Sequence, residues 1–179
     1  MSSGVQGDTE IIDLYGSDRE KAFRLLVVHY SPRLYSSIRK IITGHENADD
    51  VLQNVWVKVW LNFSKFKGES KLYTWLYRIT VNECLTFLES SKKHVTINID
   101  HAANTAGSTS HTNGDEIQKK LAIAIDTLPP RQKVVFSMRY YDETPYEEMS
   151  LILGITIGAL KASYHHAAKK IEAFLLGSN

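Results

Sequence analysis

The sequence predicts an all-α protein made of two small helical domains joined by a flexible linker. Apolar residues recur at helical spacing through residues 17–90 and again through 116–171. Between these stretches, the centre of residues 94–115 is rich in Asn, Thr, Ala, Gly and Ser, a composition typical of a flexible linker. The stretch 144–171 has the pattern of a helix, a tight turn and a second helix. The expected division is therefore a domain at 10–93, a linker at 94–115, and a domain containing a helix-turn-helix at 116–176.

Charge and composition limit the kinds of partner. The 179 residues include 21 Lys and Arg against 20 Asp and Glu, a net charge of +1, which is too balanced for binding nucleic acid by bulk charge. Any binding to nucleic acid must rest on local patches or on a partner protein. The single Cys84 excludes an intramolecular disulfide and indicates a buried free thiol. No run approaches the length of a membrane span and the start lacks a signal-peptide core, so we expect a cytoplasmic protein without membrane insertion.

The first domain begins with two amphipathic helices. Ser17 is expected to cap the first, and Pro32 to interrupt or kink it. Asn47 is expected to cap the second, with Asp50 at the capping-box position. That helix carries Trp56 and Trp60 on one edge, together with carboxylates. Two interpretations stay open for this edge: core packing, or a protein-binding surface, because Trp is enriched at interface hot spots.

Aromatic and basic residues alternate in the next segment. A loop at 62–70, which includes Phe63 and Phe66, precedes a helix from about Ser70 that carries Trp75. From residue 65 to residue 93 there are six basic and three acidic side chains, a balance of +3. Rings that stack on unpaired bases and cations that meet phosphates are what single-stranded DNA requires. An ordinary amphipathic helix remains the alternative.

The second domain is expected to contain four helices, of which the last two form the helix-turn-helix. Thr144 is expected to cap the first of these with Glu147 as its capping-box partner, and Gly154 to end it in the left-handed conformation. Thr156 then caps the second helix. The apolar positions expected on its buried face are Ile157, Leu160, Tyr164, Ala168 and Ile171. The other positions include four basic or histidine side chains and no acid before Glu172, as suits a DNA major groove. A plain helical hairpin in an all-α core is the alternative.

Three blocks in this order resemble the sigma-70 family of bacterial transcription initiation factors, in its small extracytoplasmic-function (ECF) group. The blocks are Asp50-Val-Leu-Gln53-Asn-Val-Trp56 with Trp60; Phe66-Lys-Gly-Glu-Ser with Thr74-Trp-Leu-Tyr-Arg78-Ile and Asn82; and Leu128-Pro-Pro-Arg131-Gln-Lys-Val-Val-Phe with Tyr146-Glu-Glu-Met through Ile171. They resemble the region-two helix that docks on polymerase, the minus-ten recognition and melting segment, and region four, which reads the minus-thirty-five element. The resemblance covers about residues 15–90 and 115–175.

This resemblance implies a factor, not an enzyme, that binds core RNA polymerase and directs it to promoters. The implied polymerase-binding residues are Asp49, Asp50, Gln53, Asn54 and Trp56. The implied minus-ten residues are Lys65, Phe66, Lys67, Ser70, Lys71, Trp75, Arg78 and Asn82. The implied minus-thirty-five residues are Thr156, Gly158, Ala159, Lys161, Ser163, His165, Lys169 and Lys170. The implied partners are promoter DNA, the clamp and flap regions of core polymerase, and an anti-sigma factor; the free protein is expected to be a monomer with no cofactor.

The sequence departs from the family pattern at three positions. Asn54 stands where the family usually has an acid, which changes part of the expected polymerase contact. Ser163 and His166 stand where the family usually has arginines. An arginine fork on guanine contributes about 1–3 kcal/mol of discrimination against the wrong base. We therefore expect a different or less strictly read promoter sequence.

Two other classes of function compete with this interpretation. A helix-turn-helix regulator that acts without core polymerase accounts for residues 115–175 but assigns no role to the aromatic segment at 50–90. A metal site at His165 and His166 would need further ligands at suitable spacing. Neighbouring histidines on a helix point about 100° apart, and no Cys or Glu lies nearby at ligand spacing, so no metal site is expected.

Overall fold

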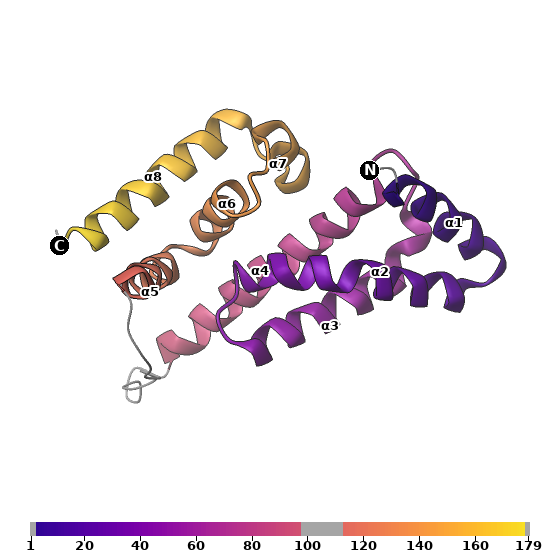
Figure 1. Cartoon of the computed structure of the whole chain (residues 1–179), viewed down its shortest axis with the longest axis horizontal. Coiled ribbons are helices and arrows are strands. Elements are labelled where there is room, and N and C mark those ends of the chain that lie inside the picture. The colour runs from indigo at the N-terminus through magenta and orange to yellow at the C-terminus, as the bar shows by residue number, and fades with distance from the viewer. Residues whose placement is uncertain (1–2, 98–112, 178–179) are drawn as a thin grey trace. The chain divides into compact units, whose positions relative to one another are not determined.

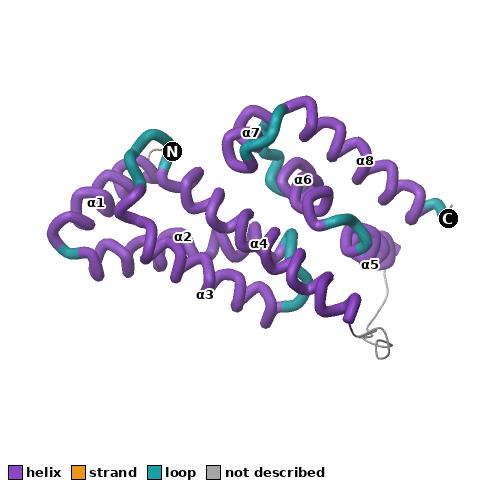
Figure 2. Tube along the Cα trace, turned by 180° about the vertical axis from the view of Figure 1, so that it is seen from behind, coloured by secondary structure: helices purple, strands orange, loops and turns teal. Residues whose placement is uncertain are grey.

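The computed structural model describes residues 3–97 and 113–177, and all regular structure in these ranges is helical (Figures 1 and 2). The helices are α1 (Ser3–Ser17), α2 (Arg19–Arg39), α3 (His45–Asn62), the short 3₁₀ helix η1 (Phe63–Lys65), α4 (Leu72–Ile97), α5 (Asn113–Asp126), α6 (Pro130–Tyr140), α7 (Tyr146–Leu153) and α8 (Ile157–Leu175). The chain forms two compact units, residues 1–84 and 85–179, which divide inside α4. The all-α prediction is confirmed.

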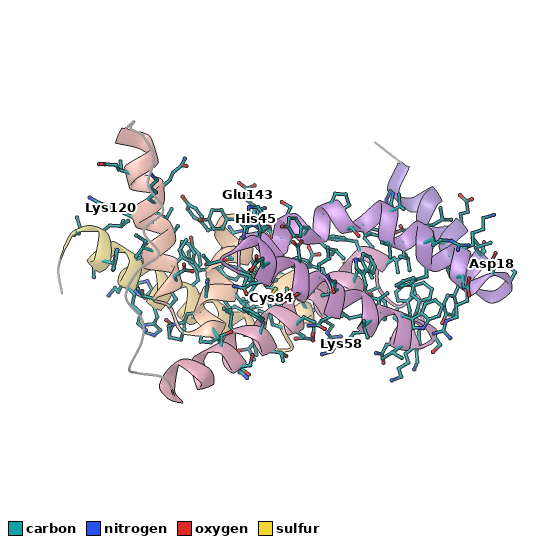
Figure 3. All side chains as sticks on the ribbon, turned by 90° about the horizontal axis from the view of Figure 1, so that it is seen from below. Asp18, His45, Lys58, Cys84, Lys120 and Glu143 are labelled. Atoms are coloured by element: carbon teal, nitrogen blue, oxygen red, sulfur yellow. The ribbon has the colours of Figure 1, made fainter. Side chains whose placement is uncertain are left out.

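The first unit contains a helix that the sequence analysis missed. We expected the domain to start at residue 10 and its first helix at Ser17, but α1 already begins at Ser3. Asp18 ends α1 and caps α2 by accepting a hydrogen bond of 3.0 Å from the Lys21 N–H, so the predicted cap at Ser17 is wrong by one residue (Figure 3). Pro32 lies inside a continuous α2, which corrects the predicted interruption.

A buried apolar core holds α2, α3 and α4 together. Its largest fully buried members in this unit are Leu26, Leu34, Ile38, Ile42, Val51, Leu72 and Leu76. On α1, Ile11 is also buried, and Asp8 accepts a hydrogen bond from the Tyr30 hydroxyl on α2. Burial, followed by this contact, raises the pKa of Tyr30 above its ordinary value. The N-terminal helix is therefore an integral layer of the first unit.

Gly44 precedes α3 with a φ of 89°, a conformation in which glycine avoids the penalty of a side chain. Asn47, predicted as the cap, lies inside the helix and donates to the Thr43 carbonyl at 3.0 Å instead. Lys58 on α3 forms an ion pair with the nearly buried Glu83 on α4. This pair ties the two helices that carry most of the predicted first-domain site residues.

The second unit contains the four predicted helices α5–α8. Its core joins three of them through Ala124, Ile125, Leu128, Phe136, Ala167 and Ile171, with Leu121 and Tyr164 packed against it. Leu160 on α8, and Met149 and Ile152 on α7, are also buried. Gly154 ends α7 with a φ of 68°, and Thr156 caps α8 by accepting a 3.2 Å hydrogen bond from the Ala159 N–H. Both predictions at this turn are confirmed.

The predicted start of α7 is wrong. Pro145 is the N-cap, and no side chain in the described part of the chain caps this helix. Thr144 is buried, and its N–H donates to the Met138 carbonyl at 3.0 Å. Arg139 donates to the Thr144 and Glu143 carbonyls at 3.4 and 3.3 Å, so backbone contacts hold the α6–α7 turn.

The centre of the predicted linker, residues 98–112, lies outside the described residues. Helix α4 extends to Ile97 and α5 begins at Asn113, so both ends of the 94–115 segment are helical. The prediction that this segment is flexible stays a prediction.

Candidate nucleic-acid interface

An aromatic cluster of Tyr15, Phe63, Phe66 and Trp75 surrounds the loop that precedes α4. Phe63 lies at the centre, with ring centroids 4.4 Å from Tyr15, 6.2 Å from Phe66 and 5.8 Å from Trp75. Phe66 and Trp75 are 5.5 Å apart. Phe63 is buried, whereas Phe66 and Trp75 are half-buried. Half-buried rings on a packed base are suited to stacking on unpaired bases.

Helix α4 continues this surface as a polar stripe. Lys71 precedes the helix, and Lys71, Trp75, Arg78 and Asn82 follow one another at spacings of four, three and four residues, so all four share one face. Lys71, Arg78 and Asn82 are exposed. In the loop, Lys67 and Ser70 are exposed, and Lys65 donates to the Asn62 side chain at 2.8 Å. The predicted minus-ten residues thus lie in the loop before α4 and along one face of α4, where exposed cations neighbour the half-buried rings in the sequence and in helical spacing.

A second surface lies on α3. Asp49, Asp50, Gln53 and Asn54 are all exposed on this helix. Trp56 is half-buried against Phe23, with centroids 5.9 Å apart, and its Nε1 is buried without a hydrogen-bond partner among the described residues. Trp56 therefore belongs partly to the packing of α2 against α3. The four polar residues are the exposed part of this predicted surface, and Trp56 is half-buried beside them.

A third surface lies on α8, the second helix of the helix-turn-helix. Leu160, Ala167 and Ile171 bury one face of α8. Exposed residues between its start and Lys170 are Gly158, Ala159, Lys161, Ala162, His165, His166, Lys169 and Lys170, and Glu172, Phe174 and Leu175 are exposed in the last turns. Ser163 is half-buried, as are Tyr164 and Ala168, and Thr156 is exposed at the start of the helix. The N–H groups in the first turn other than that of Ala159, which Thr156 caps, and the cations along the helix are suited to phosphate contacts.

The sequence analysis missed Arg19, which links several of these parts. Its guanidinium carbon lies 4.2 Å from the Trp60 ring centroid and 5.5 Å from that of Tyr15. Its Nη2 donates to the Trp60 carbonyl at 2.6 Å. The partners are far apart in the sequence, so helical periodicity could not reveal them. The sequence alone shows only that aromatic residues are frequent near the ends of α1 and α3.

Two family models match the chain, and each covers one of the two units in large part. Sigma-70 region 2 matches residues 26–94, and Sigma-70 region 4 matches residues 118–171. The chain belongs to the sigma-70 family, in its ECF group. As a sigma factor it is a transcription initiation factor that directs RNA polymerase to promoters, and it is not an enzyme.

Similar proteins span nearly the whole sigma factor. The ECF RNA polymerase sigma-E factor of Escherichia coli K12 is 25% identical over 177 residues, covering 92% of each chain. The RNA polymerase sigma-H factor of Pseudomonas aeruginosa PAO1 is 24% identical over 180 residues, covering 94% of this chain and 93% of the relative. These matches run across both domains, in agreement with the order of the three sequence blocks.

Solved structures show the same fold. CnrH in complex with the cytosolic domain of CnrY has a TM-score of 0.66 at 18% identity, covering 97% of this chain and 99% of that one. The sigma factor RpoE of Bartonella quintana, crystallised with the anti-sigma factor NepR, also has a TM-score of 0.66, at 20% identity, covering 89% of this chain and 99% of that one. No helix in the described ranges is both long and apolar enough to cross a membrane.

Proposed function

We propose that the three surfaces of this sigma factor divide promoter recognition among them. The aromatic cluster and the polar stripe of α4 capture unpaired bases of the minus-ten element. The observation that carries this assignment is the placement of Phe66 and Trp75, two half-buried rings that pack 5.5 Å apart, beside exposed Lys67, Lys71 and Arg78. Rings and cations in this arrangement bind single strands with little dependence on base identity, so Asn82 is the residue of this face best suited to add base recognition.

Helix α8 reads the minus-thirty-five duplex in this proposal. Its N-terminal N–H groups near Thr156, together with Lys161, Lys169 and Lys170, contact phosphates and set the position of the helix in the groove. Gly158, Ala159, Ser163 and His165 then lie where base edges and backbone approach the helix. With no arginine on this face, the base readout rests on weaker contacts than a guanidinium fork would make.

The polar face of α3 docks on the clamp of core polymerase, and the second unit on the flap. Asp49, Asp50, Gln53 and Asn54 are exposed along α3 and provide carboxylate and amide groups for a basic partner surface. Polymerase then supplies the chemistry and most of the DNA-binding surface, which accounts for a net charge of only +1 on the sigma factor itself.

An anti-sigma factor is a further proposed partner. The Bartonella quintana RpoE structure is a complex with an anti-sigma factor, and it shares the fold of this chain. Such a partner would hold the sigma factor away from polymerase by covering the surfaces assigned above.

Overexpression followed by genome-wide mapping of transcription start sites tests the proposed function. We expect new start sites preceded by two shared motifs, one at each promoter element. A variant with Lys161, Lys169 and Lys170 all changed to alanine should lose these starts while remaining folded, because the upstream phosphate contacts are gone. No new start sites from the wild-type protein in a host with compatible polymerase would contradict the proposal.

A further inference from the structure

We propose that Arg19 and Tyr15 are positioning residues for base capture: they hold the Phe63–Phe66–Trp75 rings in place, so that the α1–α2 junction belongs to the minus-ten apparatus. This inference rests on the proposed role of the Phe66 loop. Neither Arg19 nor Tyr15 lies in the polar stripe of α4, and each is expected to act through the rings rather than by touching DNA.

The first link is the end of α3. Trp60 lies in the last turn of α3, where backbone carbonyls lack partners within the helix. Arg19 is the first residue of α2, and its Nη2–H group donates a hydrogen bond of 2.6 Å to the Trp60 carbonyl. Its guanidinium carbon lies over the Trp60 ring, 4.2 Å from the ring centroid. One side chain thus fixes both the backbone and the ring of the same residue. Because η1 starts three residues later, this contact fixes where the aromatic loop begins.

The second link is Tyr15, near the end of α1. Its ring lies 5.5 Å from the Arg19 guanidinium and 4.4 Å from the Phe63 ring. Phe63 is only 4% exposed, so its position is set by packing. Tyr15, Phe66 and Trp75 are the three aromatic neighbours of Phe63 in the cluster. Loss of the Tyr15 ring would remove the nearest of these ring contacts.

The third link connects Phe63 to the rings that meet DNA. The Phe66 N–H donates to the Phe63 carbonyl at 2.9 Å, and the two rings stack at 6.2 Å. Phe66 itself has an extended backbone and lies outside any helix, so these contacts with Phe63 and Trp75 define its orientation. A ring that must receive an unstacked base loses affinity when it samples other orientations, because ordering it then costs conformational entropy.

The chain offers a matched control on the same unit. Arg33 on α2 lies 3.5 Å from the centroid of Tyr73 on α4, which is a cation–π contact of the same kind. This pair is outside the cluster of Tyr15, Phe63, Phe66 and Trp75. A general loss of stability from removing a surface cation–π contact would therefore show in Arg33→Gln as well as in Arg19→Gln.

The test uses holoenzyme assembled from core RNA polymerase and each sigma variant. The probe is a fork-junction DNA with a single-stranded minus-ten region, built from one start site mapped upon overexpression. We expect Arg19→Gln and Tyr15→Ala each to weaken binding by about threefold to tenfold, a part of the loss from removing a stacked ring. Tyr15→Phe, which keeps the ring, should bind like wild type, and Arg33→Gln should stay within about twofold. The melting temperature and the affinity for core polymerase should change little in Arg19→Gln.

A double-mutant cycle with Phe66→Ala separates positioning from general stability. If Arg19 and Tyr15 act through Phe66, their effects should be smaller than additive once Phe66 is removed.

Additive losses, equal losses in Arg33→Gln, or a matching fall in polymerase affinity would overturn the positioning role. If Phe66→Ala weakens binding but the Arg19 and Tyr15 variants do not, the positioning role fails while the proposed function stands. If Phe66→Ala has no effect, the assigned role of the loop fails, and the positioning role fails with it. Should Tyr15→Ala not fold, Arg19→Gln decides.

Discussion

The two proposed DNA-binding surfaces of this sigma factor are built in opposite ways. In the first unit, Phe66 and Trp75 are half-buried rings supported by other rings, and the cations lie around them. In the second unit, α8 exposes lysines, histidines and small residues, and its aromatic Tyr164 packs inward against Phe136 at 5.5 Å. Stacking on an unpaired base needs an accessible ring face, whereas entering a duplex groove needs a narrow polar helix. We propose on this basis that one unit is adapted to melted DNA and the other to duplex DNA.

Removing a buried apolar side chain of α8 should give the largest change in free energy among these predictions. Leu160 is fully buried, and Leu160→Ala should destabilise the second unit by about 2–5 kcal/mol through lost burial and a cavity. Hydrogen exchange read by mass spectrometry should show lost protection at 116–176 and unchanged protection at 19–84. The exposed Glu172→Ala serves as the control and should stay within about 0.5 kcal/mol. Equal loss of protection in both ranges would show that the units do not fold separately.

Trp75→Phe tests whether the aromatic cluster binds bases or only packs. A stacked base contributes about 1–3 kcal/mol, and a smaller ring should retain only part of it. We expect permanganate reactivity of promoter thymines in the holoenzyme to fall while the melting temperature of the sigma factor holds, since phenylalanine keeps much of the bulk. A parallel fall of both quantities would make Trp75 a core residue.

Restoring an arginine on α8 should sharpen the duplex readout. His166 is exposed on α8, and if α8 reads the duplex as proposed, His166→Arg should gain about 1–3 kcal/mol for guanine at the position that it contacts. Binding of holoenzyme to a library of minus-thirty-five sequences measures this shift. Gln118→Arg adds the same charge at an exposed position of another helix, α5, and should not change base preference. An equal increase on all sequences in the His166 variant would mean phosphate contact only.

Removing a single phosphate contact should cause the smallest loss of binding affinity among these predictions. Lys169→Ala should weaken upstream binding on all sequences alike and reduce the slope of log K against log salt by about 0.9. The measurement is fluorescence anisotropy of holoenzyme on promoter duplex at several salt concentrations. Lys120→Ala, an exposed lysine of α5, is the matched control and should leave the slope unchanged (Figure 3). An altered base preference with an unchanged slope would assign Lys169 to base readout.

Sequence patterns predicted the helices of this protein better than their ends. The turn at Gly154 and the cap at Thr156 follow from local chemistry, and both are confirmed. Thr144 also has the chemistry of a cap, but it is buried and its backbone bonds to Met138 and Arg139, so tertiary contacts override the local preference. Helix α1 was missed because its glycines weaken the helical signal and its stability comes from packing.

The proposed site shows the same division between local and tertiary information. Helical spacing puts Lys71, Trp75, Arg78 and Asn82 on one face, whereas their role and the site residues of α3 and α8 were implied by the resemblance to the sigma-70 family. The contacts of Arg19 with Trp60 join residues 41 positions apart, and no local pattern encodes such a pairing. Half-burial of Trp56 and Trp75 also depends on which helices cover them, which only the fold determines.

The central claim is that the sigma factor becomes promoter-specific only together with polymerase. With a net charge of +1, the free chain should bind promoter duplex only in the nonspecific range of about 10⁻⁴–10⁻⁶ M at physiological salt. The decisive measurement is permanganate footprinting of promoter thymines, with anisotropy on the same fragment, for sigma factor alone, core polymerase alone and the two combined. We predict specific binding and unpaired thymines only when sigma factor and core polymerase are combined. Tight, sequence-specific binding by the free chain, unchanged by polymerase, would contradict it and favour a helix-turn-helix regulator that acts alone.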